Sequence, residues 1–348
     1  MSDKKKSCAA FPERRGKVGG QAVLEGLMMR GKTVHSTAIR TPDGNITRQT
    51  EPNKTIKDKI KFLKCPIIRG VVNFVESLIL SMSILTYSAE ALGLEAEEES
   101  KFDKWLTKTF GDALMKVVTA IGMVLGVALA LVLFMWLPAL ISKFIGGFLP
   151  QEAIYPAALN VIRSVIEGCI KIGLFVLYVW AVSFMPDIKR TFQYHGAEHK
   201  TIFCYENGLE LTVENIKKQK RQHPRCGTSF MIVMMIVSII VSSFISWDNV
   251  IIRTGIKILT LPLVMGLGYE FLMFAGKHDN IIVRILSAPG LWLQNITTCE
   301  PYADQIEVAI VALKSALPEE YAEESVFENI ILPQSKEAPE APETTEEK

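Results

Sequence analysis

The sequence predicts an α-helical multi-pass membrane protein with about four transmembrane helices, an interfacial or re-entrant helix and a small N-terminal cytoplasmic β-hairpin region. Three observations carry this prediction. Hydrophobic residues make up 49% of the 348 residues and 22% are charged, which favours mixed membrane and soluble parts. Several apolar runs are long enough to cross about 30 Å of hydrocarbon. Charge is distributed unevenly along the sequence. The net charge is only +1, so no specific nucleic-acid binding is expected.

The N-terminal part divides into a leader and a small β region. Residues 1–15 are charged and are predicted to be disordered; no apolar core follows them, so no cleavable secretion signal is expected. In the cytoplasmic region 16–60, glycines interrupt Gly19–Gly31 and predict tight turns with close packing. Thr33–Arg40 and Asn45–Thr50 flank a Thr-Pro-Asp-Gly turn and predict a β-hairpin.

Residues 61–112 are predicted to form an interfacial helix followed by an acidic linker. The helix covers Pro66–Leu85, which is strongly apolar. Arg69, Asn73 and Glu76 nevertheless recur on one face of its first turns. A polar face on an apolar helix is typical of a segment that lies in the membrane interface, so a full span is not expected here.

Residues 113–275 are predicted to form the four-span membrane domain. The spans are expected at Val117–Ile141, Ala157–Met185, Ser229–Trp247 and Ile256–Ala275. Most lysines and arginines near these spans lie in the loop 187–228, between the second and third spans. The positive-inside rule therefore places this loop and both termini on the cytoplasmic side of the membrane.

The C-terminal region contains two further predicted helices and a tail. Within residues 276–325, Asp279–Leu286 and Gln305–Leu317 have the pattern of short amphipathic helices on the cytoplasmic side. Residues 326–348 are rich in proline, glutamate and threonine and are predicted to be a disordered acidic tail.

The second predicted span contains a ladder of charges. Arg163, Glu167 and Lys171 are spaced i, i+4 and i+8, which places them on one face. The preferred interpretation is that they neutralise one another near the outer interface, because opposite charges alternate along the ladder. The alternative is a polar track that lines a substrate path.

The loop 187–228 contains an H-x-x-E-H sequence formed by His195, Glu198 and His199. On a helix the two histidines share one face, with Cβ atoms about 5–6 Å apart, so both imidazoles can bind one ion. This is the inverted form of a zinc hydrolase motif, in which the glutamate acts on a water molecule. We therefore predict His195 and His199 as ligands of Zn²⁺ or another divalent metal, and Glu198 as the catalytic base.

A hydrolytic site also needs a third protein ligand and one open position. Three candidates for the third ligand are His223, Cys226 and Glu270, of which His223 or Glu270 is expected to complete a hydrolytic site; Glu270 would otherwise orient an imidazole. Cys226 lies three residues after His223, and a site that used both in addition to the motif would be closed and structural. Without a metal, the motif histidines and Lys200 would contact lipid phosphate or carboxylates of the protein.

Five motifs, in order, resemble the YqhQ-like bacterial membrane proteins over about residues 16–318. They are G-G-Q-A-V-L-E-G-L-M-M-R-G, P-I-I-R-G-V-V-N-F-V-E-S-L, Y-H-G-A-E-H-K, H-P-R-C-G-T-S-F and S-A-P-G-L-W-L-Q-N-I-T-T-C-E-P. The resemblance implies a bacterial plasma-membrane protein of a family labelled as predicted metal-dependent enzymes. It brings no established substrate.

Two functions from different classes follow. The first is a membrane-embedded metal-dependent hydrolase that acts at the cytoplasmic face on a lipid headgroup, a lipid-linked precursor or a peptide. The second is a non-enzymatic membrane factor or scaffold that assists membrane-protein biogenesis or transport. Its basic loop would contact translocation or ribosome components, and its polar motifs would hold helices together. The lipid bilayer is the expected environment of both.

Overall fold

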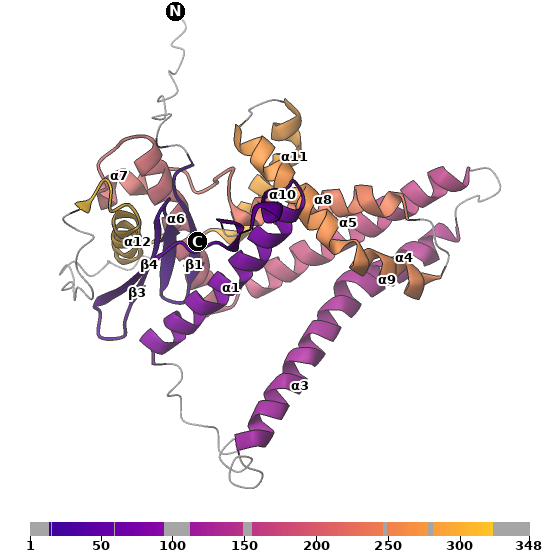
Figure 1. Cartoon of the computed structure of the whole chain (residues 1–348), viewed down its shortest axis with the longest axis horizontal. Coiled ribbons are helices and arrows are strands. Elements are labelled where there is room, and N and C mark those ends of the chain that lie inside the picture. The colour runs from indigo at the N-terminus through magenta and orange to yellow at the C-terminus, as the bar shows by residue number, and fades with distance from the viewer. Residues whose placement is uncertain are drawn as a thin grey trace, which may run out of the picture.

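The computed structural model describes residues 14, 16–58, 60–93, 112–148, 155–245, 249–277 and 281–322. In this part of the chain a four-stranded sheet with packed helices lies at one end, and long apolar helices extend away from it (Figure 1). The mostly helical fold with an N-terminal antiparallel β region is confirmed. The predicted leader up to residue 13, the acidic linker after residue 93 and the tail 326–348 lie outside the described residues.

The sheet is antiparallel, and its strands follow chain order: β1 (Gly19–Val23), β2 (Gly26–Arg30), β3 (Val34–Arg40) and β4 (Ile46–Pro52). The predicted hairpin is β3–β4, with Ile39 opposite Thr47. The glycine-rich segment forms the hairpin β1–β2, whose strands are joined by a tight turn at Leu24 and Glu25. Its glycines also permit the expected close packing: a Cβ on Gly26 would lie 2.2 Å from the Ala38 carbonyl oxygen.

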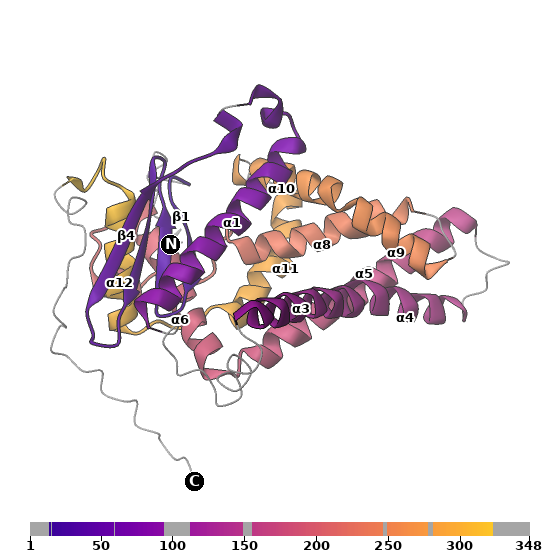
Figure 2. The same cartoon turned by 60° about the horizontal axis from the view of Figure 1, so that its bottom comes forward.

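Both faces of the sheet are covered by helices. Alternate residues of a strand point to opposite faces, and Leu27 and Met29 pack in a cluster with α6 (Pro186–Glu206), α7 (Val213–Lys217) and α12 (Ala303–Ala316). Met28, between them, packs on the other side against Ile84 of α1 (Ile68–Ala91). Figure 2 shows α1 and α12 on opposite sides of the strands. The helix predicted at Gln305–Leu317 is α12.

The remaining helices are mostly apolar. They are α3 (Asp112–Leu131), the π-helix η4 (Val132–Trp136), α4 (Leu137–Gly146), α5 (Pro156–Val182), α8 (Gly227–Ser243), α9 (Val250–Leu259), α10 (Leu261–Lys277) and α11 (Ile281–Thr297); two short 3₁₀ helices, η1 (Ile56–Asp58) and η2 (Lys61–Lys64), precede α1. By length and composition, three stretches of the described chain can cross a membrane: Ile68–Ala91, Val124–Gly146 and Ala158–Val182. The pair Ile251–Leu259 and Leu261–Ala275, bent by 49°, makes a fourth if it is one span.

These stretches differ in two places from the predicted spans. The expected third span is α8, whose 17 residues make it a shorter apolar helix that is not among the candidate spans. The expected interfacial helix is α1, which has 24 residues and is long enough to cross. Its polar positions suggested an interfacial location, but they contact protein: Arg69 pairs with Glu270 of α10, and Glu76 accepts hydrogen bonds from the Thr55 hydroxyl and the Ile56 amide.

The end of the helical part also departs from expectation. The short helix predicted at Asp279–Leu286 overlaps the beginning of α11, which has 17 residues and contains Pro289; residues 279 and 280 lie outside the described residues. This helix packs against α8 and α5. It ends directly before the segment that approaches the histidine motif, so its length matters for the site.

Candidate metal centre

The predicted helical geometry of the H-x-x-E-H motif is present in α6. The helix begins at Pro186, whose fixed φ suits the first turn and whose missing amide hydrogen costs nothing there. His195 and His199 lie one turn apart on the same face, with ring centroids separated by 4.3 Å. The second histidine is fully buried, whereas the first is partly exposed.

A third donor reaches these histidines from α8. Cys226 is the residue directly before the first turn of that helix and is buried. Its Sγ lies 3.1 Å from Nε2 of His195. One donor atom from each of His195, His199 and Cys226 can be chosen so that all three lie within 4.8 Å of one another. Two imidazoles and a thiol therefore converge on one small volume.

Backbone carbonyls orient both rings. Nδ1 of His195 lies 2.8 Å from the carbonyl oxygen of Thr297, and Nδ1 of His199 bonds the carbonyl oxygen of Arg221. A carbonyl oxygen only accepts, so each Nδ1 carries the hydrogen and donates it. Each Nε2 then keeps its lone pair, and Nε2 of His199 is buried without a hydrogen-bond partner among the described residues. This arrangement is the usual preparation of a metal-ligating histidine.

Electrostatics at the site follow from burial and from the short distances. Burial alone would raise the pKa of the Cys226 thiol, but the adjacent His199 imidazole and the Thr228 hydroxyl hold the pKa below its usual value. Burial also lowers the pKa of His199. The cluster therefore favours the neutral imidazole of His199 and the thiolate of Cys226. These are the forms that bind a metal.

Glu198 lies beside the converging donors in a dry environment. Its side chain is 5% exposed, and a Cβ on Gly20 of β1 would lie 2.8 Å from its Cγ and Cδ atoms. Burial raises the pKa of this carboxyl to about 8; the charge of His195 opposes the rise and that of Cys226 adds to it. Within the described chain no hydrogen bond or ion pair reaches the carboxyl, so a positive charge in the cluster would act on it strongly.

Two of the three candidate third ligands, His223 and Glu270, do not join the converging donors. The ring centroid of His223 is 5.6 Å from that of His199, but its Nε2 faces Glu206 at 3.8 Å. Glu270 binds Arg69 of α1, with oxygens 2.7 Å from Nε and 2.5 Å from Nη2. Neither belongs to the converging group, in which Cys226 takes the third place. Its sequence signal was the position directly before an apolar helix.

The loop that carries Cys226 is held by buried polar contacts. Gln294 of α11, fully buried, accepts a hydrogen bond from the His223 amide at 2.7 Å. Its side-chain amide donates to the His223 carbonyl at 2.9 Å and to the Ser229 hydroxyl at 2.8 Å. Glu206, at the end of α6, binds Arg225 and accepts from the Gly16 amide at 2.8 Å. Together they fix Cys226 against the motif helix.

Removing the Gln294 side chain should loosen this loop. We expect Gln294→Ala to weaken divalent metal binding by about 10–100-fold, because loss of groups that orient ligands has effects of this size. Gln222→Ala is the control, because Gln222 lies in the same loop and, among the described residues, its side chain bonds only Asn295, at 2.8 Å near the surface. The measurement is metal affinity by competition with a chelator. Equal affinities of the two variants would contradict the positioning role.

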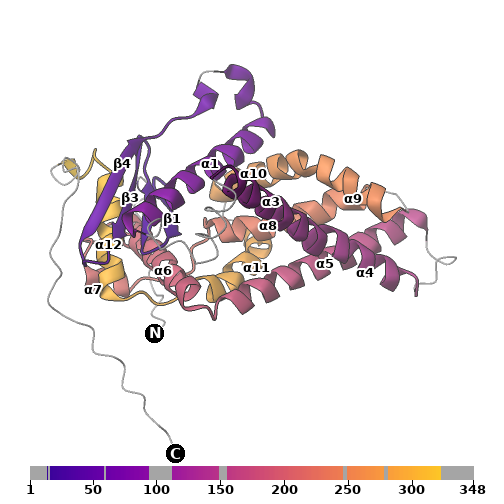
Figure 3. The same cartoon turned by 90° about the horizontal axis from the view of Figure 1, so that it is seen from below.

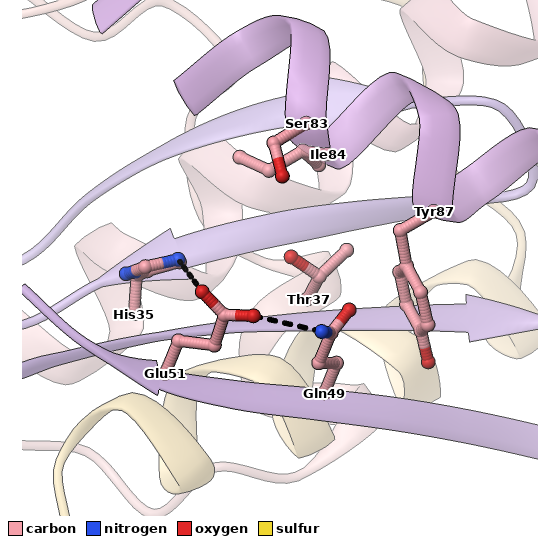
Figure 4. A pocket seen from close by; sticks show the side chains of 7 residues that line it. All are labelled: His35, Thr37, Gln49, Glu51, Ser83, Ile84 and Tyr87. Carbon is pink, nitrogen blue, oxygen red and sulfur yellow. Dashed lines mark hydrogen bonds and ion pairs between the residues drawn. The ribbon is translucent and has the colours of Figure 1, made fainter. Parts of the chain in front are cut away.

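Another histidine lies outside the cluster and has partners of its own. His35 lines a small hollow between β3, β4 and α1, together with Glu51 and Tyr87 (Figure 4). Its Nδ1 lies 3.1 Å from the side-chain oxygen of Asn53, and its Nε2 lies 4.0 Å from the Glu51 carboxylate. It is therefore a suitable control for substitutions in the motif.

Comparisons with known proteins cover the site and most of the chain. A family model described as "Protein of unknown function (DUF1385)" matches residues 65–319. The uncharacterized protein YqhQ of Bacillus subtilis (strain 168) is 36% identical over 304 residues, which cover 86% of this chain and 92% of the relative. No solved structure matches the chain. The chain therefore belongs to the YqhQ-like family of proteins of unknown function.

Proposed function

We propose that the protein is a metal-dependent hydrolase of the bacterial plasma membrane, with its site at the cytoplasmic face. The observation that carries the proposal is the convergence of three donor atoms within 4.8 Å, with both Nδ1 atoms bound to carbonyl oxygens. Neutral imidazoles and a thiolate are the ligands that Zn²⁺ accepts well. Metal binding would draw the three donor atoms closer together, because bonds from Zn²⁺ to nitrogen and sulfur are about 2.0–2.3 Å long.

The number of ligands favours catalysis over a closed structural site. A site in which only His195, His199 and Cys226 bind the ion would leave one coordination position for a water molecule or a substrate. His223 would close the set, but it faces Glu206. An ion bound there would supply Lewis-acid chemistry and lower the pKa of a water molecule in the open position.

Glu198 supplies the proton transfer. Its pKa of about 8 without a metal reflects burial, and a bound cation would favour the ionised form, which can accept a proton from the water. The protonated carboxyl would then donate to the leaving group. The backbone of Gly20 covers one side of Glu198 and restricts the access of bulk water on that side.

The position of α6 supports a substrate at the membrane surface. In Figures 2 and 3 this helix lies at the junction between the sheet and the apolar helices. The candidate spans bury only 11–17% of their apolar windows within the protein, which favours a lipid environment. A lipid headgroup, a lipid-linked precursor or a peptide near the cytoplasmic leaflet fits this placement.

The metal content of the purified full chain tests the proposal. We expect about one divalent ion per chain, and we expect His199→Ala to lose it because one of three ligands is absent. The control is His35→Ala, which removes a histidine that bonds Asn53 and should keep the ion. Equal metal content in wild type and His199→Ala would exclude the metalloenzyme and favour a membrane scaffold whose polar motifs hold helices together.

A further inference from the structure

A second polar cluster lies between α5 and α9. Lys257 of α9 donates to both oxygens of Glu167 of α5. Arg253, one turn earlier on α9, donates from Nη2 to the Ser164 hydroxyl at 3.0 Å, and the same atom lies 3.8 Å from Glu167. The side chains are almost inaccessible: Glu167 is 2% exposed, Lys257 5% and Arg253 8%.

These contacts differ from the expected ladder on α5. The sequence favoured mutual neutralisation of Arg163, Glu167 and Lys171 on a single helix, but the carboxylate binds cations of a different helix. Lys171 lies close enough to act electrostatically on both Glu167 and Lys257. It is only partly buried, so the cluster has one edge that is open to its surroundings.

Positive charge exceeds negative charge here. Arg253, Lys257 and Lys171 surround one carboxylate, and in the described part of the chain no second acidic residue makes an ion pair with them. Glu270, the acidic residue of α10, binds Arg69. Uncompensated charge within apolar helices is costly unless a counter-ion balances it. The cluster therefore favours an anion.

Two polar groups of α9 also lack hydrogen-bond partners in the described part of the chain. Nε of Arg253 is buried and has no hydrogen-bond partner among the described residues, and the same is true of the Thr254 hydroxyl. A guanidinium group presents five donors in a plane and binds phosphate oxygens in pairs. The unused Nε–H is the donor such an oxygen would take.

The apolar surface around the cluster favours an anionic lipid over a free ion. In Figures 1, 2 and 3, α9 lies at the end of the helical part farthest from the sheet, away from the histidine motif on α6. The outer face of α9 is apolar and exposed: Ile251 is 74% exposed and Leu259 80%. Acyl chains fit such a surface, whereas a free ion would have to leave water.

We propose that Arg253, Lys257 and Lys171 bind the phosphate group of an anionic lipid between α5 and α9. Arg253 donates from Nε, and the two lysines contribute charge. The acyl chains lie along the apolar face of α9. This site is separate from the metal centre and does not depend on it.

Thermal unfolding of the purified full chain in neutral detergent tests the site, because a ligand of the folded state raises the unfolding midpoint. The probes are dioctanoyl phosphatidylglycerol, dioctanoylglycerol, which lacks phosphate, and inorganic phosphate. We expect only the phospholipid to raise the midpoint in a saturable manner, with affinity reduced at least ~10-fold in Arg253→Gln. Arg253→Gln keeps the Lys257–Glu167 pair. If Arg253→Gln does not fold, the same measurement is made on Lys171→Gln.

The control and the opposing outcomes are specific. Lys143→Gln removes an exposed charge on α4 and should keep wild-type affinity. Equal affinity in wild type, Arg253→Gln and Lys171→Gln would overturn the proposal, as would equal stabilisation by dioctanoylglycerol. Saturable protection by inorganic phosphate that is lost in Arg253→Gln would retain the phosphate site and exclude a lipid as its source.

Discussion

Replacing Glu198 by glutamine is expected to abolish hydrolysis while the metal remains bound. The substitution keeps the size of the side chain, and Glu198 is not one of the three converging donors. The amide of glutamine cannot accept the proton of a water molecule, so the acid–base contribution of about 10²–10⁴-fold in rate should be lost. Metal content should stay at the wild-type level.

The measurement uses membrane lipids and peptides, because the substrate class is part of the proposal. Wild type and Glu198→Gln are incubated with a bacterial lipid extract and with a peptide library, and products are identified by mass spectrometry. Glu51→Gln is the matched control, since Glu51 lies on the exposed edge of β4 beside His35. If Glu198→Gln converts any wild-type substrate at the wild-type rate, Glu198 is not the base.

The sequence predicted the part of the site that local geometry determines. The spacing of His195 and His199 fixes their common face once α6 forms, so both histidines and Glu198 could be named in advance as candidate site residues. Cys226 could be placed near them only as one of several candidates. Its position depends on contacts across the fold, such as the bonds of Gln294 to the His223 backbone, which no local pattern contains.

The same distinction explains the differences in the fold. The polar residues of α1 have the spacing of an interfacial helix, and only the distant partner Glu270 shows that Arg69 faces protein. The glycines of β1 and β2 indicated a tight turn and close packing, but a sequence does not show what lies beside a missing Cβ. Gly20 faces Glu198, and Gly26 faces Ala38. In each case the sequence left open a contact between residues distant in the chain.

Gly196→Ala is expected to destabilise the protein and to weaken its metal site together. A Cβ at this position would lie 2.0 Å from the carbonyl oxygen of Cys299, a distance that no packing tolerates. The Cys299 amide also donates to the Phe192 carbonyl at 2.9 Å, so this segment is bound to α6 and cannot simply move away. We expect a loss of about 3 kcal/mol in the free energy of unfolding.

The coupling to the metal follows from chain continuity. Thr297, whose carbonyl oxygen orients His195, is two residues before Cys299, so a displaced segment would also release that imidazole. The control is Gly173→Ala on α5, where nothing lies within 4 Å of the added Cβ; helix propensity predicts unchanged or higher stability. Unfolding monitored by fluorescence, with metal affinity measured in parallel, compares the two variants. If Gly196→Ala matches Gly173→Ala in both stability and metal affinity, α6 does not approach this segment as closely as described, and the segment does not orient His195.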